Sequence, residues 1–422
     1  MRSLSRREFL RSSAAAAAGL SLGGSLLAAC STTRPKPRTS SIPLVRKENP
    51  VTWPISGDNP PIASGLEIEK GATLKVYQWR EYLYEAVLDD FAKRFDVSFE
   101  VENYETIQEG VEGVRGPMRD FDVFFPTVEA LGELVQSRML LPLNHDYLPN
   151  TANLWPVFTR KGAPFYDVGE RYSVPYTVYS TGIMWRRDLV DARIAPDNTG
   201  YDSIWDFGEN VGVIDNYREG IGLALLRGGV QDVNTADPTL VERAVNHLIE
   251  LHDVYVTAEG AYEDVPQGHT PISQAWSGDF FSAPFYGRSN VRRSAENLGY
   301  WWPKDGTGIA GNDLTSVLAN GKNPVLAHAF VNHLMDTGVA LKNFTWNGYQ
   351  PPIRTLTKAW LRDCGDGAPG ASAICFMYGP SADAVVEPDA FERSPMLLPL
   401  HPETDALWQS EWQRFLEHAE KT

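Results

Sequence analysis

Between residues 74 and 137 short apolar segments alternate with amphipathic ones, and this alternation constrains the fold more than any other feature of the chain. Segment 83–95 follows a helical period, with Val87, Phe91 and Phe95 on one face. A β-α-β-α series predicts a parallel sheet with helices on both faces. Ligands of such sheets bind at loops beyond the carboxyl ends of the strands. The predicted elements are strands at 74–77, 97–101 and 122–126 and helices at 83–95 and 128–137.

A second series of strands and helices follows. At roughly 100–200 residues per domain, a chain of 422 residues predicts two domains. A β-rich stretch from 172 to 185 has the composition of a segment that crosses between domains. The other predicted elements are a buried strand at 211–214, helices at 238–252 and 323–336, a strand followed by a loop at 273–278, and a turn at 347–352.

The N-terminal segment has the pattern of an export signal. Ser5-Arg6-Arg7-Glu8-Phe9-Leu10 is a twin-arginine head, and a weakly apolar run then leads to Leu27-Ala28-Ala29-Cys30, a lipobox. We therefore predict a twin-arginine lipoprotein signal peptide at 1–29 and a lipidated N-terminus with a flexible tether at 30–70, the lipid being carried by Cys30. The mature protein is then exported, either lipid-anchored to the outer face of the cytoplasmic membrane or periplasmic.

The formal net charge of −16 excludes two classes of partner. Nucleic acids and anionic lipid surfaces both reward basic patches, so neither is expected to bind this chain. Besides the N-terminal segment, no apolar run approaches the length of a membrane span. We predict that the lipid anchor is the protein's only attachment to a membrane.

Two cysteines remain beside Cys30. Cys364 and Cys375 flank a short connector, and outside the cytoplasm such a pair is predicted to form a disulfide. No histidine or further cysteine pair lies nearby in the sequence, so we predict no metal site and no cofactor.

Several short motifs, in order, give the chain a family resemblance. It resembles the extracytoplasmic polyamine-binding proteins of ABC importers, the spermidine/putrescine type. The motifs are Trp79-Arg80-Glu81-Tyr82, Leu141-Pro142-Leu143, Leu148-Pro149-Asn150, Tyr172-Ser173-Val174-Pro175-Tyr176, Asp215-Asn216-Tyr217-Arg218-Glu219, Trp276-Ser277-Gly278, Asn312-Asp313 and Gly348-Tyr349.

The resemblance implies an α/β periplasmic-binding-protein fold with two lobes, a hinge and a ligand cleft between the lobes. Lobe 1 would comprise 71–178 and 309–346, and lobe 2 would comprise 179–308 and 347–422. The implied function is capture of a small organic cation, such as putrescine or spermidine, and its delivery to the permease subunits of an ABC importer. The protein would not be an enzyme.

The resemblance also implies a set of ligand-binding residues. A polyamine needs aromatic faces against its methylenes and carboxylates against its ammonium groups. The aromatic walls would be Trp79, Tyr82, Trp276 and Tyr349. The carboxylates would be Glu81, Glu219 and Asp313, and Thr127 stands where the family has a small hydroxyl residue.

Four positions depart from the family pattern: Arg80, Glu129, Asn216 and Gly311. Asn216 removes a carboxylate that Glu129 could restore, and Gly311 removes an aromatic wall that Trp301 or Trp302 could refill. Arg80 adds a cation. An alternative ligand is therefore an amino-acid-like or other amine that carries its own carboxylate and is recognised partly through Arg80.

An exported hydrolase is the competing class. The chain has no G-x-S-x-G or H-E-x-x-H motif. Glu81 and Asp313 could nonetheless form a pair of catalytic carboxylates, as in glycoside hydrolysis. A ferric-iron-binding protein would require a pair of adjacent tyrosines, which the matching positions lack.

Overall fold

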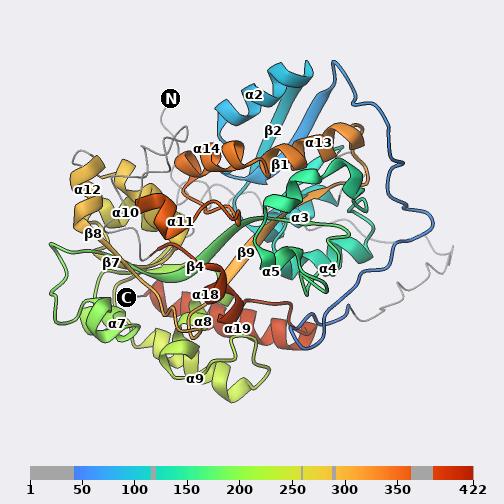
Figure 1. The fold of residues 1–422 in the computed structure, drawn as a ribbon. Helices are drawn as coiled ribbons and strands as arrows, with labels where there is room; N and C mark the ends of the chain where they lie inside the picture. The colour runs from blue at the N-terminus through green and yellow to red at the C-terminus, as the bar shows by residue number, and fades with distance from the viewer. Residues whose placement is uncertain (1–41, 116–119, 258–259, 288–290, 363–383, 422) are drawn as a thin grey trace, which may run out of the picture. The chain divides into compact units, whose positions relative to one another are not determined.

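Two antiparallel strands, β4 and β9, run through the middle of a nine-stranded sheet and join its two halves (Figure 1). The computed structural model describes residues 42–115, 120–257, 260–287, 291–362 and 384–421, and residues 42–422 form one unit. The strands are β1 (Thr73–Trp79), β2 (Ser98–Tyr104), β3 (Val123–Phe124), β4 (Val174–Arg186), β5 (Val211–Ile214), β6 (Val254–Thr257), β7 (Ile272–Trp276), β8 (Leu298–Trp301) and β9 (Ala310–Val317).

The helices cover both halves of this sheet. In Figure 1, α13 and α14 lie beside α2 and the strands β1 and β2, although they come from the other end of the chain. The longer helices are α2 (Glu85–Phe95), α3 (Ile107–Val114), α4 (Val128–Gln136), α8 (Tyr217–Arg227), α9 (Pro238–Ile249), α10 (Gly260–Gln267), α13 (Pro324–Leu334), α14 (Thr337–Asn347) and α19 (Pro402–Ala419). The short ones are α5 (Pro156–Thr159), α6 (Pro196–Thr199), α7 (Asp202–Phe207), α11 (Ser277–Ser282), α12 (Val291–Asn297), α15 (Lys358–Arg362), α18 (Pro388–Arg393) and the 3₁₀ turns η1 (His145–Tyr147), η2 (Pro149–Asn153) and η3 (Ala283–Phe285).

The strand order is β2-β1-β3-β9-β4-β7-β5-β6, with β8 paired to β4. Each end of the sheet is parallel, since β1 pairs in parallel with β2 and β3, and β5 pairs in parallel with β6 and β7. In the middle, β9 is antiparallel to both β3 and β4, and β4 is antiparallel to β7. The parallel sheet predicted for the strands at 74–77, 97–101 and 122–126 is confirmed, and the antiparallel strands β4 and β9 join it to the second half. A hydrophobic pattern indicates that a strand exists but carries no information about its direction.

The segment after β7 also differs from the prediction. A loop was expected at 277–278, but helix α11 begins at Ser277. The carboxylate of Asp279 accepts a hydrogen bond from the backbone N–H of Trp276 at 3.2 Å, which satisfies a group at the start of this helix. Gly278 is needed there for space, because a Cβ atom at this position would lie 2.5 Å from the Tyr349 ring.

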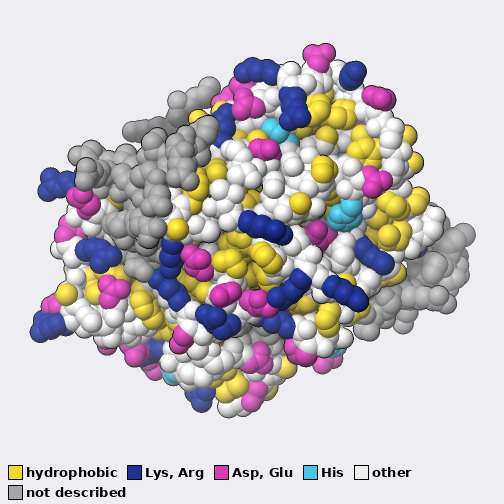
Figure 2. Space-filling view, viewed as in Figure 1, with side chains coloured by type: hydrophobic (Ala, Val, Ile, Leu, Met, Phe, Trp, Pro, Cys, Tyr) yellow, Lys and Arg dark blue, Asp and Glu magenta, His cyan; other side chains and the backbone are white. Residues whose placement is uncertain are grey.

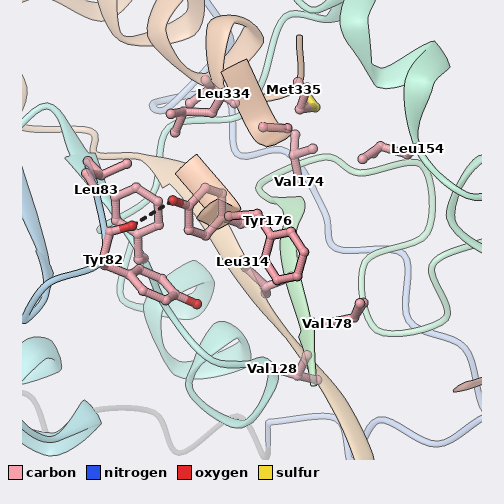
Figure 3. Close-up of a cluster of buried hydrophobic side chains, with 14 of the residues drawn as sticks. Tyr82, Leu83, Val128, Leu154, Val174, Tyr176, Val178, Leu314, Leu334 and Met335 are labelled. Atoms are coloured by element: carbon pink, nitrogen blue, oxygen red, sulfur yellow. Dashed lines mark hydrogen bonds between the residues drawn. The ribbon is translucent and has the colours of Figure 1, made fainter. Parts of the chain in front are cut away.

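Hydrophobic side chains pack in two main clusters. The larger cluster joins β1, β3, α2, α4 and α13, and the second fills the space between β5, α8, α9 and α19. Figure 3 shows part of the larger cluster, where Tyr82 and Tyr176 meet and the Tyr176 hydroxyl donates to the backbone carbonyl of Tyr82 at 3.0 Å. This hydrogen bond holds β4 against the loop that follows β1.

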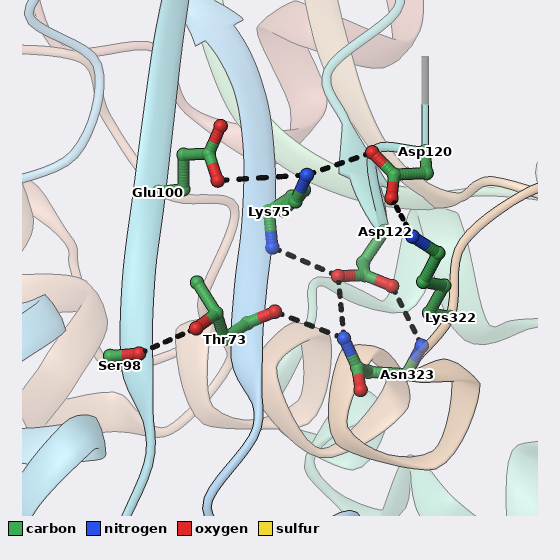
Figure 4. Close-up of polar contacts among 8 residues, drawn as sticks. All are labelled: Thr73, Lys75, Ser98, Glu100, Asp120, Asp122, Lys322 and Asn323. Atoms are coloured by element: carbon green, nitrogen blue, oxygen red, sulfur yellow. Dashed lines mark hydrogen bonds and ion pairs between the residues drawn. The ribbon is translucent and has the colours of Figure 1, made fainter. Parts of the chain in front are cut away.

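A buried carboxylate ties β1 to the loop before α13 (Figure 4). Asp122 is fully buried and accepts hydrogen bonds from the Lys75 backbone N–H at 2.9 Å and from the Asn323 backbone N–H at 2.8 Å. The Asn323 side-chain amide adds a third bond at 3.1 Å. Segments far apart in the sequence are therefore held together through one side chain.

Residues 42–70 form no helix or strand but pack on the sheet half that contains β1. Trp53 is buried and its indole N–H donates to the Tyr166 carbonyl at 2.8 Å. The Lys47 ammonium group donates to the Ser394 carbonyl, so this segment also contacts the chain that follows α18. Cys30, Cys364 and Cys375 lie outside the described residues.

Acidic and basic side chains are interspersed on the face shown in Figure 2. Among the helices that the structure describes, none is both long enough and apolar enough to cross a membrane.

We predict that Asp122→Ala lowers the free energy of unfolding by about 2–3 kcal/mol, because three donors lose a buried acceptor. Glu100→Ala is the matched control, since its carboxylate is half exposed and lies 3.6 Å from the Lys75 ammonium group. The control should change the free energy by about 0.5 kcal/mol or less. Urea denaturation of both variants measures the difference, and equal effects would contradict the structural role of Asp122.

Candidate functional site

The candidate site lies where the carboxyl ends of β1, β3, β5 and β7 approach the crossing strands β4 and β9. Each strand end is followed by one predicted binding segment: the loop after Trp79, Thr127 at the start of α4, Asn216 at the start of α8, and Trp276 before α11. Thr127 forms an isolated β-bridge with Asp313 of β9. The segment that follows β3 therefore contacts β9 directly.

Asp313 is held by two hydroxyl groups. The Tyr82 hydroxyl donates to its carboxylate at 2.5 Å, and the Thr177 hydroxyl of β4 lies 3.4 Å from the same oxygen. Burial raises the pKa of Asp313 to about 6, and the negative charge of Glu129 adds to the effect. The structure thus brings Tyr82, Thr127 and Asp313 together.

Glu219 lies on α8 and is buried. One of its carboxylate oxygens accepts a hydrogen bond from the Trp276 indole N–H at 2.9 Å, while the other has no partner among the described residues. Burial raises the pKa of Glu219 to about 7. An unpaired carboxylate oxygen inside a protein is costly, so this atom is available to a donor from a ligand.

Glu129, on the first turn of α4, is the third carboxylate of this cluster. Burial raises its pKa, and the positive charge of Arg218 opposes that shift. The Arg218 guanidinium is itself buried and bonded elsewhere, to the Leu398 carbonyl at 2.9 Å and to the Asn234 side chain at 2.7 Å. We call Glu129, Glu219 and Asp313 the acidic cluster. Glu219 and Asp313 each interact electrostatically with Glu129, and Glu129 and Glu219 also interact with this arginine.

Aromatic rings flank the acidic cluster. The ring of Tyr82 contacts those of Tyr176 and Tyr349, with centroids 5.0 and 5.7 Å apart. The Tyr349 hydroxyl donates to Asp279 at 3.0 Å. Trp276 is half-buried and reaches Glu219 through its indole N–H.

The other predicted residues lie apart from the acidic cluster or form hydrogen bonds with backbone groups. Trp79 packs against Tyr104 and donates to the Phe125 carbonyl at 3.2 Å. Arg80 is exposed and forms an ion pair with Glu105. Glu81 is exposed and accepts a hydrogen bond from the Tyr286 hydroxyl at 3.2 Å. The Asn216 side chain caps α8, accepting from the Arg218 N–H at 2.9 Å.

The space next to Gly311 is occupied by Tyr179. A Cβ atom at position 311 would lie 2.6 Å from the Tyr179 hydroxyl oxygen. Trp301 instead contacts Tyr201, at a centroid distance of 5.0 Å, and Trp302 is buried in the larger hydrophobic cluster.

Sequence reasoning missed Tyr179, Asp279 and Arg218. Asp279 stands three residues after Trp276, the spacing at which a carboxylate accepts a hydrogen bond from the backbone N–H of the residue that precedes a helix. This spacing could have been used to predict the helix start. Tyr179 follows Thr177 by two residues, so both point to the same face of β4. The position of the Arg218 side chain had no such signal, because it depends on contacts with residues 234 and 398.

Two surface cavities, of about 280 and 360 Å³, lie elsewhere. Arg186 and Pro266 line the first, and Tyr201 and Trp301 line the second; neither contains a residue of the acidic cluster. Within the described residues, no group of three or more His, Cys, Asp or Glu side chains is placed to hold a metal ion.

The fold, in which crossing strands join two half-sheets, is the two-lobe α/β fold of substrate-binding proteins. Residues 86–360 match the model of the bacterial extracellular solute-binding protein family, and the chain belongs to that family.

Named relatives agree with this assignment. The chain is 26% identical over 284 residues to spermidine/putrescine-binding periplasmic protein 1 of Haemophilus influenzae, covering 66% of this chain and 74% of the relative. It is 27% identical over 334 residues to the spermidine/putrescine-binding periplasmic protein of Salmonella typhimurium, covering 72% and 90%. The crystal structure of a spermidine/putrescine ABC transporter substrate-binding protein from Streptococcus pneumoniae is similar in fold, with a TM-score of 0.63 and 20% identity over 82% of this chain and 99% of that one. The expected two-lobe α/β fold is confirmed.

The raised pKa of Glu219 predicts a pH-dependent stability. The pKa is about 7 in the folded protein and 4.5 is its ordinary value, so the folded state binds the proton more tightly than the unfolded state. The stability gained from protonation is fully present below pH 4.5 and is lost as the pH rises through 7. Glu219→Gln keeps an oxygen for the Trp276 indole but cannot ionise. We expect it to raise the free energy of unfolding by about 1–3 kcal/mol at pH 8 and by much less at pH 4.5.

Urea denaturation at the two pH values measures this change. Glu209→Gln is the control, because Glu209 is exposed and should give no gain at either pH. A gain for Glu219→Gln that is the same at both pH values would contradict a cost of ionisation.

Proposed function

We propose that this protein captures a small organic cation of the polyamine class outside the cytoplasm and delivers it to the permease of an ABC importer. One observation carries the proposal: the buried Glu219 and the half-buried Glu129 and Asp313 form one acidic cluster, and Arg218, which opposes the charge of Glu129 and Glu219, is already bonded to other groups. Burying three carboxylates is costly unless cations meet them. The named substrates of the relatives, spermidine and putrescine, are such cations.

The aromatic rings support an aliphatic amine as the ligand. Methylene groups pack on ring faces, and an ammonium group near such a face gains about 0.5–2 kcal/mol. Tyr82, Tyr349 and Trp276 stand beside the acidic cluster and are each bonded to one of its members or to Asp279. This arrangement fits a ligand with charged ends and an apolar middle.

The alternative ligand, an amine with its own carboxylate recognised through Arg80, has less support. The Arg80 guanidinium pairs with Glu105 and its side chain is 54% exposed. A ligand carboxylate would have to replace Glu105 as the partner of this arginine.

We also propose that the protein has no catalytic activity, that Cys30 carries its lipid anchor and that Cys364 and Cys375 form a disulfide. Glu81, one member of the carboxylate pair that a hydrolase would need, is exposed and bonded to Tyr286. The family to which the chain belongs is one of solute-binding proteins. Recovery of an intact ligand after prolonged incubation tests the absence of turnover.

Binding of putrescine and spermidine by the mature protein, measured by titration calorimetry, tests the proposed function. Asp313→Asn keeps an oxygen for the Tyr82 hydroxyl but removes the charge, and we expect at least tenfold weaker binding because a buried charge partner is worth about 2–5 kcal/mol. Arg80→Ala is the control and should leave the affinity within about twofold. If Arg80→Ala abolishes binding and Asp313→Asn does not, the ligand is the carboxylate-bearing amine instead.

We further predict that the ligand closes a hinge between the two halves of the sheet. The strands β4 and β9 connect the halves, and the acidic cluster has members on α4 of one half, on α8 of the other and on β9. Small-angle scattering should show a smaller radius of gyration with saturating ligand than without it. An unchanged radius would argue for a rigid site.

A further inference from the structure

Tyr179 and Gly311 face each other at the center of the candidate site. They are partners in the antiparallel register of β4 and β9, and one pair, Val178 and Asn312, separates them from the pair formed by Thr177 and Asp313. Side chains alternate between the two faces of a strand, so Thr177 and Tyr179 share one face of β4, and Gly311 and Asp313 share the corresponding face of β9. Because Thr177 contacts Asp313 on this face, Tyr179 lies on the same face as the acidic cluster.

The opposite face of this strand pair packs into the protein core. Val178 is buried in the larger hydrophobic cluster, and the Asn312 side chain donates to the Tyr166 hydroxyl at 2.9 Å. The contrast between the two faces indicates that Tyr179 serves the site and not the core. Its side chain is half-buried, while its neighbours Val178 and Ser180 are buried.

The two residues are sterically matched. A Cβ atom on residue 311 would come within 2.6 Å of the Tyr179 hydroxyl oxygen and 2.7 Å of the ring carbon that bears it. Real Cβ atoms do not approach other atoms so closely, so a larger residue at position 311 requires the Tyr179 side chain to move. One aromatic ring therefore fills this space, and it comes from β4.

The environment of the Tyr179 hydroxyl is anionic. Its pKa is raised by burial and by the charges of Glu219, Asp313 and Glu129, so all three members of the acidic cluster act on this group. No hydrogen bond from this hydroxyl to another described residue is found. The hydroxyl oxygen and the ring thus present a hydrogen-bond acceptor and an apolar face to an amine that binds among the three carboxylates.

We propose that Tyr179, opposite Gly311, determines the length of the amine that the site accepts. The inference rests on the proposed function. The Tyr179 ring occupies volume beside the acidic cluster, whose three members all act on its hydroxyl, so we expect the space left over to fit an α,ω-diamine better than a longer triamine. The ring face packs against the methylene groups, and its removal enlarges the space beside Gly311 and the acidic cluster.

The test compares putrescine and spermidine as probes, by titration calorimetry, in the wild-type protein and in two variants. Tyr179→Gly removes the ring, and we expect the ratio of the two dissociation constants to move at least tenfold in favour of spermidine. Tyr179→Phe keeps the ring and removes the hydroxyl, so the ratio should stay within about threefold of the wild type. If Tyr179→Gly does not fold, Tyr179→Val takes its place, because a β-branched residue is well tolerated in a strand.

A second arm tests the steric match. Gly311→Ala alone should weaken putrescine binding at least tenfold, because the new methyl group displaces Tyr179. The double variant with Tyr179→Gly should bind both amines like Tyr179→Gly alone, an interaction that a double-mutant cycle detects.

The outcomes separate the two claims. If the wild-type protein binds neither amine, the proposed function is wrong and the inference falls with it. If the wild type binds amines but Tyr179→Gly and Tyr179→Val leave the ratio unchanged, the proposed function stands and the role of Tyr179 is overturned.

Discussion

The cost of burying negative charge is the constraint on which the account of this protein depends. Glu129, Glu219 and Asp313 lose water, and burial raises the pKa of each. Indole and hydroxyl donors satisfy part of the cluster, but one oxygen of Glu219 has no partner among the described residues. Stability alone would favour neutral side chains at these positions. We therefore infer that these carboxylates are present because a cationic ligand compensates their charge.

The crossing strands make this cluster possible. Tyr82, Thr177 and Asp313 are widely separated in the sequence, and they meet because β9 pairs with β4 on one side and with β3 on the other. The same ladder sets Tyr179 against Gly311. Two halves of a sheet that are each parallel and locally connected thus share a site that neither half could form by itself.

Much of this arrangement could be predicted from the sequence, and the reasons for the rest are physical. Periodicity predicted α2 and the strand at 211–214, whose residues face a core, and the motif order predicted Asp313, Glu219 and Tyr82 as parts of one site. The direction of β4 and β9 could not be predicted, because an apolar strand has the same pattern whichever way it runs. Arg80 and Glu81 follow Trp79 directly, yet their side chains turn to Glu105 and Tyr286, contacts that depend on tertiary structure. Tyr179 was overlooked because its partner is a glycine, which leaves no side chain to suggest a contact.

The most direct test of the central claim is the number of protons released when an amine binds. Carboxylates with raised pKa values hold protons in the empty site and must give them up to meet a cation, so release is linked to binding. Titration calorimetry of putrescine at pH 6.5, in phosphate and in ACES, which differ in ionisation enthalpy, measures this number from the difference between the observed enthalpies. The account predicts release of on the order of half to one proton per ligand. Equal enthalpies in the two buffers, or proton uptake, would contradict it.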